Sequence, residues 1–293
     1  MNTYHIPILV DEIVTGLRVT KGKKYIDATV GGGGHTRAIL KRGGIVLGID
    51  ADREAVEYTT GELRIKDKEL GTDGNWKIVQ GNFRNLEEIA KREGFEEANG
   101  VLFDLGVSSR QLDDASKGFT YREDAAPLDM RFDSASGEPA SGVLKRFSQE
   151  ELYEIFSTLG EEEHSRAIAH ALVSTRSINS IETAGDIRRV VESVVGERGA
   201  NEVLSRIFQA LRMYVNDEKG SLVRGLEAAK RILTTNGRIA VLSFHSIEDR
   251  IVKQSFREPG WRLVIKKPVR ATIEEQTVNR RSRSAKLRIA EKV

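Results

Sequence analysis

The sequence predicts an α/β protein whose mainly parallel sheet has helices on both faces and is interrupted by an all-helical insert. Short apolar strands alternate with helical stretches through about the first hundred residues and again near the end of the chain. Between these regions only a long loop and helices are expected. We therefore divide the chain into a first core segment, a loop with a helical insert, and a second core segment with basic terminal strands, at residues 1–110, 111–216 and 217–293.

The first segment contains four predicted strands, each short and rich in Val, Ile, Leu or Phe. Such runs are typical of strands whose two faces are both covered by helices. The predicted strands span residues 24–30, 45–50, 76–83 and 100–106. A helical stretch follows each of the first three strands, at residues 35–43, 53–66 and 85–94.

The middle of the chain changes character at about Arg110. Residues 110–142 have no sustained hydrophobic period and are dense in Gly, Ser, Asp and Pro, which predicts a long loop. Three amphipathic helices follow, the first opened by a capping box of Ser148 with Glu151. They are expected from Ser148 to Gly160, from Thr183 to Gly196, and from Asn201 onward. The sequence leaves open whether this insert forms a homodimer.

The alternation of strands and helices resumes in the last segment. A helix is predicted up to an Asn-Gly stop, followed by a strand, a helix capped by Ser246, and two terminal strands. The corresponding ranges are residues 220–237, 238–246, 247–256, 261–267 and 285–291.

Composition excludes several classes of protein. The chain has no cysteine, which removes disulfides, thiolate zinc sites and thiol nucleophiles. His164 and His170 are six residues apart and cannot share a helix face as metal ligands, so no metal site is predicted. No apolar run is long enough to span a membrane and the first residues do not resemble a signal peptide, so a cytoplasmic protein is expected.

Basic residues are concentrated at one end of the chain. The net charge is only +2, but residues 262–292 contain ten Lys or Arg against three Glu. Such a cluster is expected where a protein contacts a phosphate backbone. A solvated basic surface is the equally weighted alternative.

The stretch IDATVGGGGHT, residues 26–36, places four glycines where the first strand gives way to a helix. Ligands bind at such turns in open α/β sheets, against bare backbone and the helix N-terminus, so Gly31 and Gly33 are predicted to contact a ligand. Thr36 stands where a dinucleotide fingerprint requires a third glycine, which disfavours NAD or FAD. A tight structural corner is the alternative for this turn.

Three further strand ends complete the pattern. Asp50 ends the second strand, 17 residues after Gly33, and is placed to accept hydrogen bonds from ribose hydroxyls. Gly81-Asn82-Phe83 closes the third strand and Asp104 the fourth. This layout predicts a Rossmann-like class I methyltransferase that uses S-adenosylmethionine. Asp50 as a helix cap and Asp104 as a turn cap remain alternatives.

Seven sequence blocks stand in order along the chain: HIPILVDE, IDATVGGGGHTRAIL, DLGVSSRQLDDASKGFTY, PLDMRFD, FQALRMYVNDE, SFHSIEDRIVK and RSRSAKLRIAE. Together they resemble the signature blocks of the bacterial RsmH/MraW methyltransferases over nearly the whole chain. The resemblance implies an S-adenosylmethionine-dependent enzyme that methylates the exocyclic amino group of a decoding-centre cytosine in 16S rRNA of the small ribosomal subunit.

The resemblance also implies roles for particular residues. The cofactor contacts carried over by matched motif are Gly33, Gly34, His35, Asp50, Phe83, Asp104 and Gln111. The chain departs from the family pattern at Arg280, which replaces a proline before the Arg-Ser pairs. This replacement frees the turn and adds a charge to a segment expected to contact RNA.

The chemistry requires a hydrogen-bond acceptor, because the lone pair of a cytosine amino group is delocalised into the ring. Asp104 is the first candidate, although the cofactor's ammonium group is a competing partner, and Ser108 and His245 are weaker candidates. The chain lacks the Pro-Pro-aromatic turn that many amino methyltransferases carry after the fourth strand. Phe119 or Tyr121 is expected either to stack on the flipped base or to pack in the core of the insert.

A polar stripe in the insert is the second candidate RNA contact. Arg206, Gln209, Arg212 and Asn216 recur every three to four residues opposite an apolar face. We predict that this stripe and the basic end of the chain, including Arg281 and Arg283, bind the RNA backbone; a solvated helix face is the alternative. The competing functions are a methyltransferase for DNA or another amine, a non-catalytic RNA-binding assembly factor and, third, a dehydrogenase.

Overall fold

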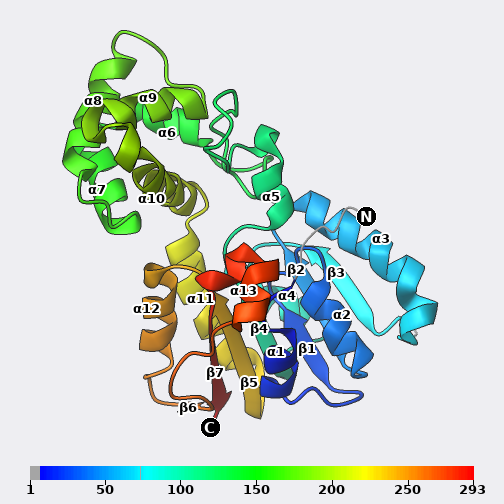
Figure 1. The fold of residues 1–293 in the computed structure, drawn as a ribbon. Helices are drawn as coiled ribbons and strands as arrows, with labels where there is room; N and C mark the ends of the chain where they lie inside the picture. The colour runs from blue at the N-terminus through cyan, green and yellow to red at the C-terminus, as the bar shows by residue number, and fades with distance from the viewer. Residues whose placement is uncertain (1–6, 73) are drawn as a thin grey trace. The chain divides into compact units, whose positions relative to one another are not determined.

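The predicted sheet is confirmed and contains seven strands in the order β3-β2-β1-β4-β5-β7-β6 (Figure 1). The computed structural model describes residues 7–72 and 74–293. Neighbours among β1 to β5 are parallel, whereas β7 runs antiparallel to both β5 and β6. The strands are β1 Lys24–Asp27, β2 Ile45–Asp50, β3 Trp76–Gln80, β4 Ala98–Asp104, β5 Leu233–Ser243, β6 Trp261–Leu263 and β7 Lys286–Lys292.

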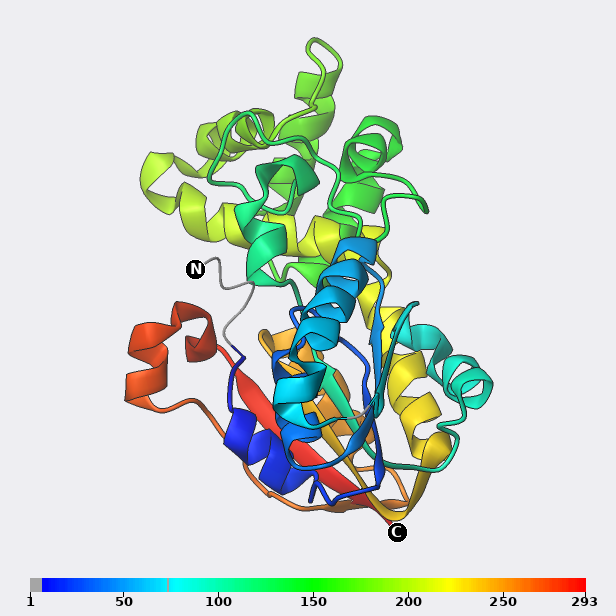
Figure 2. The ribbon, with the colours of Figure 1, turned by 90° about the vertical axis from the view of Figure 1, so that its right-hand side faces the viewer.

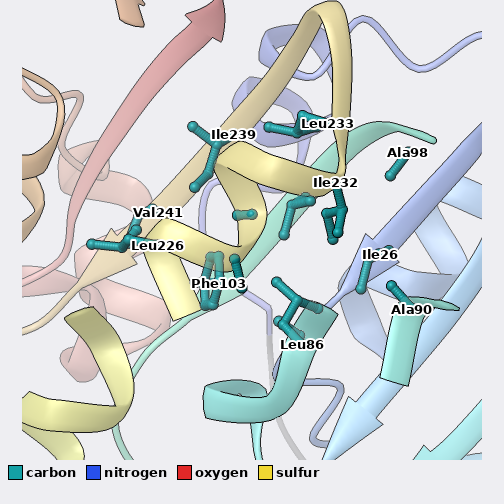
Figure 3. Close-up of a cluster of buried hydrophobic side chains, with 14 of the residues drawn as sticks. Ile26, Leu86, Ala90, Ala98, Phe103, Leu226, Ile232, Leu233, Ile239 and Val241 are labelled. Atoms are coloured by element: carbon teal, nitrogen blue, oxygen red, sulfur yellow. The ribbon is translucent and has the colours of Figure 1, made fainter. Parts of the chain in front are cut away.

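Helices cover both faces of this sheet (Figures 1 and 2). One face packs against α1 Val10–Gly16, α2 Gly34–Lys41 and α3 Arg53–Leu70, and the other against α4 Leu86–Glu93, α11 Glu218–Ile232 and α12 Ser246–Ser255. Alternate residues of β4 enter the two cores, because successive strand side chains point to opposite faces. Phe103 lies in one core with Leu86 and Leu226, as Figure 3 shows, whereas Leu102 lies in the other.

The boundary between α11 and β5 differs from the prediction. The Asn-Gly pair at residues 236–237 was expected to end the helix, but α11 ends at Ile232 and the pair lies within β5. Leu233 is buried and pairs with Ala98, so the chain enters the sheet directly after the helix. The next pair is Gly100 with Arg238, and the extra residues between them form an irregularity in which Asn236 has φ 64°.

Other strand ends are shorter than predicted. β1 ends at Asp27 rather than Val30, although the N–H groups of Ala28 and Val30 still donate to the neighbouring strands. β6 ends at Leu263, and residues 264–267 do not continue it. The apolar runs therefore predicted the strands correctly but overestimated the lengths of β1, β3 and β6.

The sheet belongs to one of two compact units, formed by the chain up to Ser108 together with Lys219–Val293. Ser109–Glu218 form the second unit, which is helical. Its helices are α5 Ser109–Asp113, α6 Ala140–Arg146, α7 Gln149–Leu159, α8 Ser165–Arg176, α9 Ala184–Val195 and α10 Glu197–Val215. No helix in the described ranges is long and apolar enough to cross a membrane.

The helix starts in the second unit follow local capping chemistry. The capping box of Ser148 with Glu151 is confirmed, and Thr183 opens α9 through a capping box with Asp186. α10 begins at Glu197 rather than Asn201, because Gly196 both ends α9 and caps α10. α8 was not predicted, since alanines supply many of its apolar positions and leave a weak periodic signal.

Candidate functional site

The glycine turn lies at the carboxyl edge of the sheet, between the ends of β2 and β4. β1 is the strand that pairs with both, so the turn after it stands where the strand order reverses. Open α/β sheets bind ligands at this position. The sequence prediction and the sheet topology therefore point to the same edge.

Three partners from different elements hold the glycine turn. The Gly31 N–H donates to Asp50 Oδ2 at 2.8 Å, and the Gly31 carbonyl accepts from Thr59 Oγ1 of α3 at 2.7 Å. The Gly32 carbonyl accepts from Arg37 Nη1 of α2 at 2.8 Å. The turn is therefore fixed relative to β2, α2 and α3 before any ligand binds.

Glycine is required at two points of this turn for different reasons. Gly33 has φ 72°, and a Cβ there would lie 2.7 Å from Thr59 Cγ2, which is shorter than van der Waals contact allows. Gly31 has φ 48°, and among the described residues its Cβ would approach only a backbone oxygen, at 3.9 Å. Gly33 is thus needed for packing against α3, whereas Gly31 leaves open space that a ligand can occupy.

The start of α2 supplies hydrogen-bond donors to the same space. Gly33 is its N-cap and provides no side-chain cap, so the first N–H groups of the helix have no side-chain acceptor there. Gly34 follows, and a Cβ at this residue would lie 2.7 Å from Pro7 Cβ. A carboxylate of a ligand is stabilised at such a helix start.

Asp50 is a half-buried carboxylate with unused acceptor capacity. Oδ2 accepts from the Gly31 N–H and Oδ1 from the Asp52 N–H at 2.9 Å. Burial raises the pKa of Asp50 to about 6, although both backbone donors lower it. Each carboxylate oxygen can accept a second hydrogen bond, so two ribose hydroxyls can bind without displacing the backbone donors.

His35 and Asp104 form a pair beside the turn. Nε2 of His35 lies 3.4 Å from Oδ2 of Asp104, and the imidazole is only 5% exposed. Neither ring nitrogen makes a hydrogen bond to any residue in the described ranges. Burial lowers the pKa of His35, but its interaction with Asp104 and the charges of Asp27 and Glu275 outweigh this and raise it above the usual value.

Asp104 is fixed at the end of β4 and remains accessible. Its N–H donates to Thr29 Oγ1 at 2.6 Å, which ties it to the segment after β1. The next residue, Leu105, continues the ladder by donating to Leu242 O of β5 at 3.0 Å. The side chain of Asp104 is 13% exposed, so its carboxylate can reach a bound molecule.

Asp27 belongs to the same cluster, and sequence reasoning assigned it no role. It is 1% exposed at the end of β1, and its Oδ2 accepts from Thr36 Oγ1 at 2.7 Å. Burial raises the pKa of Asp27, against the opposing charge of His35. Its place at the end of the first strand, four residues before Gly31, is the only signal in the sequence, and that signal does not reveal the contact with α2.

Phe83 and Gln111 complete the predicted cofactor contacts. Phe83 is half-buried after β3, with its ring 5.5 Å from that of Phe103, and the N–H of Gly81 donates to the Asp50 carbonyl. Phe83 therefore lies beside the strand that carries Asp50, where an adenine would be expected. Gln111 is buried in α5 of the second unit, and its contact with a cofactor stays a prediction.

His245 has a structural function at the start of α12. It is the N-cap of α12, which corrects the prediction of Ser246, and its capping-box partner is Glu248. Nδ1 accepts from the Glu248 N–H at 3.4 Å, and Nε2 lies 3.0 Å from Glu248 Oε1. Both ring nitrogens thus face Glu248, so His245 is a poor candidate for the acceptor. Ser108, the last residue of the first unit, is half-buried, and its catalytic role stays a prediction.

The polar stripe on α10, predicted to bind RNA with a solvated helix face as the alternative, makes contacts within the protein. The four side chains of the stripe have partners within the second unit: Arg206 with Glu162, Arg212 with Glu218, Gln209 with the Leu159 carbonyl, and Asn216 with the Met130 carbonyl. Glu162 is fully buried, so Arg206 compensates its charge. These residues stabilise the insert, and their predicted contact with RNA gains no support from the structure.

The two candidate stacking aromatics of the long loop also pack within the insert. The Phe119 ring is stacked on Phe132 with centroids 5.5 Å apart, and Phe119 is 5% exposed. Tyr121 makes an edge contact with Phe208 of α10. For Phe119 the core alternative is therefore the correct one.

The sheet order, the glycine turn and the acid at the end of β2 define a Rossmann-like class I S-adenosylmethionine-dependent methyltransferase. The residues also fit this cofactor: Asp50 can accept hydrogen bonds from the ribose, and the N–H groups at the start of α2 can donate to the carboxylate. His35 has two buried nitrogens without a hydrogen-bond partner in the described chain. The acidic groups Asp27, Asp50 and Asp104 suit a positively charged sulfonium.

Comparison with known proteins identifies the family. The chain belongs to the MraW methylase family, whose sequence model matches residues 2–293. A protein of Thermomicrobium roseum named ribosomal RNA small subunit methyltransferase H is 42% identical, over 100% of this chain and 95% of its own length. Proteins of the same name from Deinococcus radiodurans and Clostridium botulinum are 42% and 37% identical, over 98% and 100% of this chain and 89% and 100% of theirs.

The substitution Gly33→Ala is expected to weaken S-adenosylmethionine binding more than tenfold and to destabilise the protein by about 1–3 kcal/mol. The positive φ and the contact with Thr59 force the turn to move. Gly61→Ala is the matched control, because Gly61 lies in α3 with open space around its Cβ position. The Gly61→Ala variant should gain up to about 1 kcal/mol of folding stability and bind S-adenosylmethionine with normal affinity. Calorimetric titration and urea unfolding measure both effects, and normal binding by Gly33→Ala would refute the assignment.

Cofactor affinity is expected to fall as the pH drops through about 6, the pKa to which burial raises Asp50. Hydrogen bonds from ribose favour the ionised carboxylate, so affinity rises with pH up to the pKa of the free protein and then levels off for this group. Asp50→Asn should bind roughly 10- to 100-fold more weakly at neutral pH and lack the inflection near pH 6. A wild-type affinity that is constant between about pH 5 and pH 7 would contradict this assignment.

Proposed function

We propose that this protein transfers the methyl group of S-adenosylmethionine to the exocyclic 4-amino nitrogen of a cytosine in 16S rRNA of the small ribosomal subunit. The names of relatives matched over the whole chain support the substrate class. The structural observation that carries the proposal is the hydrogen bond of Gly31 to Asp50, which joins the glycine turn to the ribose acid. A ribosomal substrate supports a location in the cytoplasm, which is part of this proposal.

Asp104 is the proposed hydrogen-bond acceptor for the target amine. Its Oδ2 faces His35, which leaves Oδ1 as the oxygen available to the amine. S-adenosylmethionine, when bound, supplies a methyl group activated by a positively charged sulfur. The nitrogen loses one proton as it gains this methyl group, and Asp104 Oδ1 is the atom that we expect to receive the proton. Positioning and electrostatics account for the remaining acceleration.

The basic end of the chain is the proposed contact with the RNA backbone. Its members differ in availability: Lys286 and Arg288 pair with Asp249, and Arg262 pairs with buried Glu291. Across residues 7–72 and 74–293, five others are exposed and have no acidic partner: Lys266, Lys267, Arg270, Arg280 and Arg283. Arg281 is half-buried and interacts with other residues of the protein.

The position of these basic residues agrees with the proposed site. Lys286, the first residue of β7, pairs with Ser243 at the carboxyl end of β5, so the turn Arg280–Arg283 lies close to the edge that carries Asp104. The preceding helix, α13 Ile273–Val278, contacts the start of α1 through Glu275, whose carboxylate accepts from the Leu9 N–H at 2.9 Å. RNA bound to the turn would therefore run along the edge where methyl transfer occurs.

Mass spectrometry of 16S rRNA from a strain without this protein is expected to show one cytosine that has lost an N4-methyl group. The wild-type gene should restore the methyl group and Asp104→Ala should not. In vitro, labelled donor with assembled small subunits, naked rRNA or DNA should label rRNA only. Labelling of DNA would support the rival methyltransferase. Cofactor binding without labelling of any nucleic acid would contradict the proposed substrate.

Replacing Arg280 and Arg283 by Gln is expected to reduce the salt dependence of small-subunit binding. The slope of log affinity against log salt concentration should fall by about 2, roughly one for each lost phosphate contact. Lys21→Gln with Lys23→Gln is the matched control, since both lysines are exposed next to the start of β1, at the opposite edge of the sheet. An equal change of slope in both double variants would remove the proposed contact.

A further inference from the structure

The segment that follows β4 lacks an aromatic residue on which a base could stack. Asp104 is followed by Leu105-Gly106-Val107-Ser108, which offers no flat side chain to a base. A base that is taken out of its stack for methylation requires a surface on which to stack. Phe119, a sequence-based candidate for this surface, is buried in the second unit.

The neighbouring strand supplies an aromatic residue at the same edge. Asp104 pairs with Leu242 of β5, so Phe244 lies two residues beyond that pair, immediately after the strand. A Cβ at Gly106 would lie 3.7 Å from Phe244 Cδ2. The ring of Phe244 therefore adjoins Gly106, two residues after Asp104.

The backbone of Phe244 is held in place by the start of α12. The Phe244 N–H donates to Glu248 Oε2 at 2.8 Å, and Glu248 is only 4% exposed. The ring is half-buried against the core that contains Leu242 and Leu287. Within the described part of the chain it has no aromatic partner of its own. Phe244 thus combines a fixed backbone with a ring that is not fully covered.

We propose that Phe244 is the surface on which the target cytosine stacks while its amino group is presented to Asp104. This inference rests on the proposed function, because it assumes a base as the methyl acceptor. Each strand end then has a separate role. The turns after β1 and β2 bind the cofactor, Asp104 accepts a hydrogen bond from the amine, and Phe244 after β5 orients the base. Stacking on an aromatic ring contributes about 1–3 kcal/mol for each base and does not require a particular hydrogen-bond pattern.

The test compares Phe244→Leu, Phe244→Ala and Phe244→Tyr in methyl transfer to small subunits from a strain without the protein. Leu keeps apolar volume but removes the flat ring, so kcat/KM should fall roughly 5- to 150-fold, the fold-change expected for one lost stacking contact. Tyr should recover most of this loss, whereas Ala should not. Affinity for S-adenosylmethionine, measured by calorimetry, should be the same in all three variants.

Trp261→Leu is the matched control. Trp261 is a half-buried aromatic in β6, and its partner Lys292 lies at the opposite edge of the sheet from Asp104. Its kcat/KM should stay within about twofold of the wild type, a smaller change than one lost stacking contact would cause. If Phe244→Leu matches the wild type, or if Tyr is no better than Leu, the inference is overturned. A wild-type enzyme that binds cofactor but methylates no subunit would instead contradict the proposed function.

Discussion

The site depends on the hydrogen bond between the Gly31 N–H and Asp50, because it joins the turn after β1 to the end of β2. This bond places the open side of the glycine turn next to a carboxylate. Burial has a cost: the raised pKa of Asp50, about 6 instead of 3.8, means that ionising it lowers the stability of the free protein as the pH rises through this range. Ribose hydroxyls that donate to the ionised carboxylate would offset this cost. The free energy needed to ionise Asp50 in the free protein therefore favours ligand binding.

The charges around the turn favour a positively charged ligand. Asp27, Asp50 and Asp104 end three adjacent strands, and His35 is the basic group that lies against Asp104. Burial of several carboxylates is unfavourable unless hydrogen bonds or a cation compensate them. Backbone N–H groups, Thr36 and His35 supply part of this compensation. A sulfonium would supply more, which is why the cluster suits S-adenosylmethionine better than a neutral nucleoside.

Charged side chains that are similar in sequence have different functions in the structure. Arg206 on α10 compensates the buried charge of Glu162, whereas Arg283 is exposed in the segment before β7. Three further arginines also neutralise a buried charge: Glu291 is 1% exposed and pairs with Arg18, Arg238 and Arg262. The number of basic residues at residues 262–292 therefore overestimates the basic surface available to RNA. The exposed members without an acidic partner in the described chain all lie in the segment before β7.

Local patterns in the sequence determined the strands, the capped starts of α7 and α9, and the glycine turn with Asp50, since each depends on residues a few positions apart or on the common carboxyl edge of parallel strands. Only the tertiary structure revealed the hydrogen bond from Thr36 to Asp27, the role of His245 as the N-cap of α12, and the position of Phe244 beside Gly106. The physical reason is that these contacts depend on which strands are neighbours and on which partner neutralises each buried charge. Those choices are made by the packing of the whole sheet.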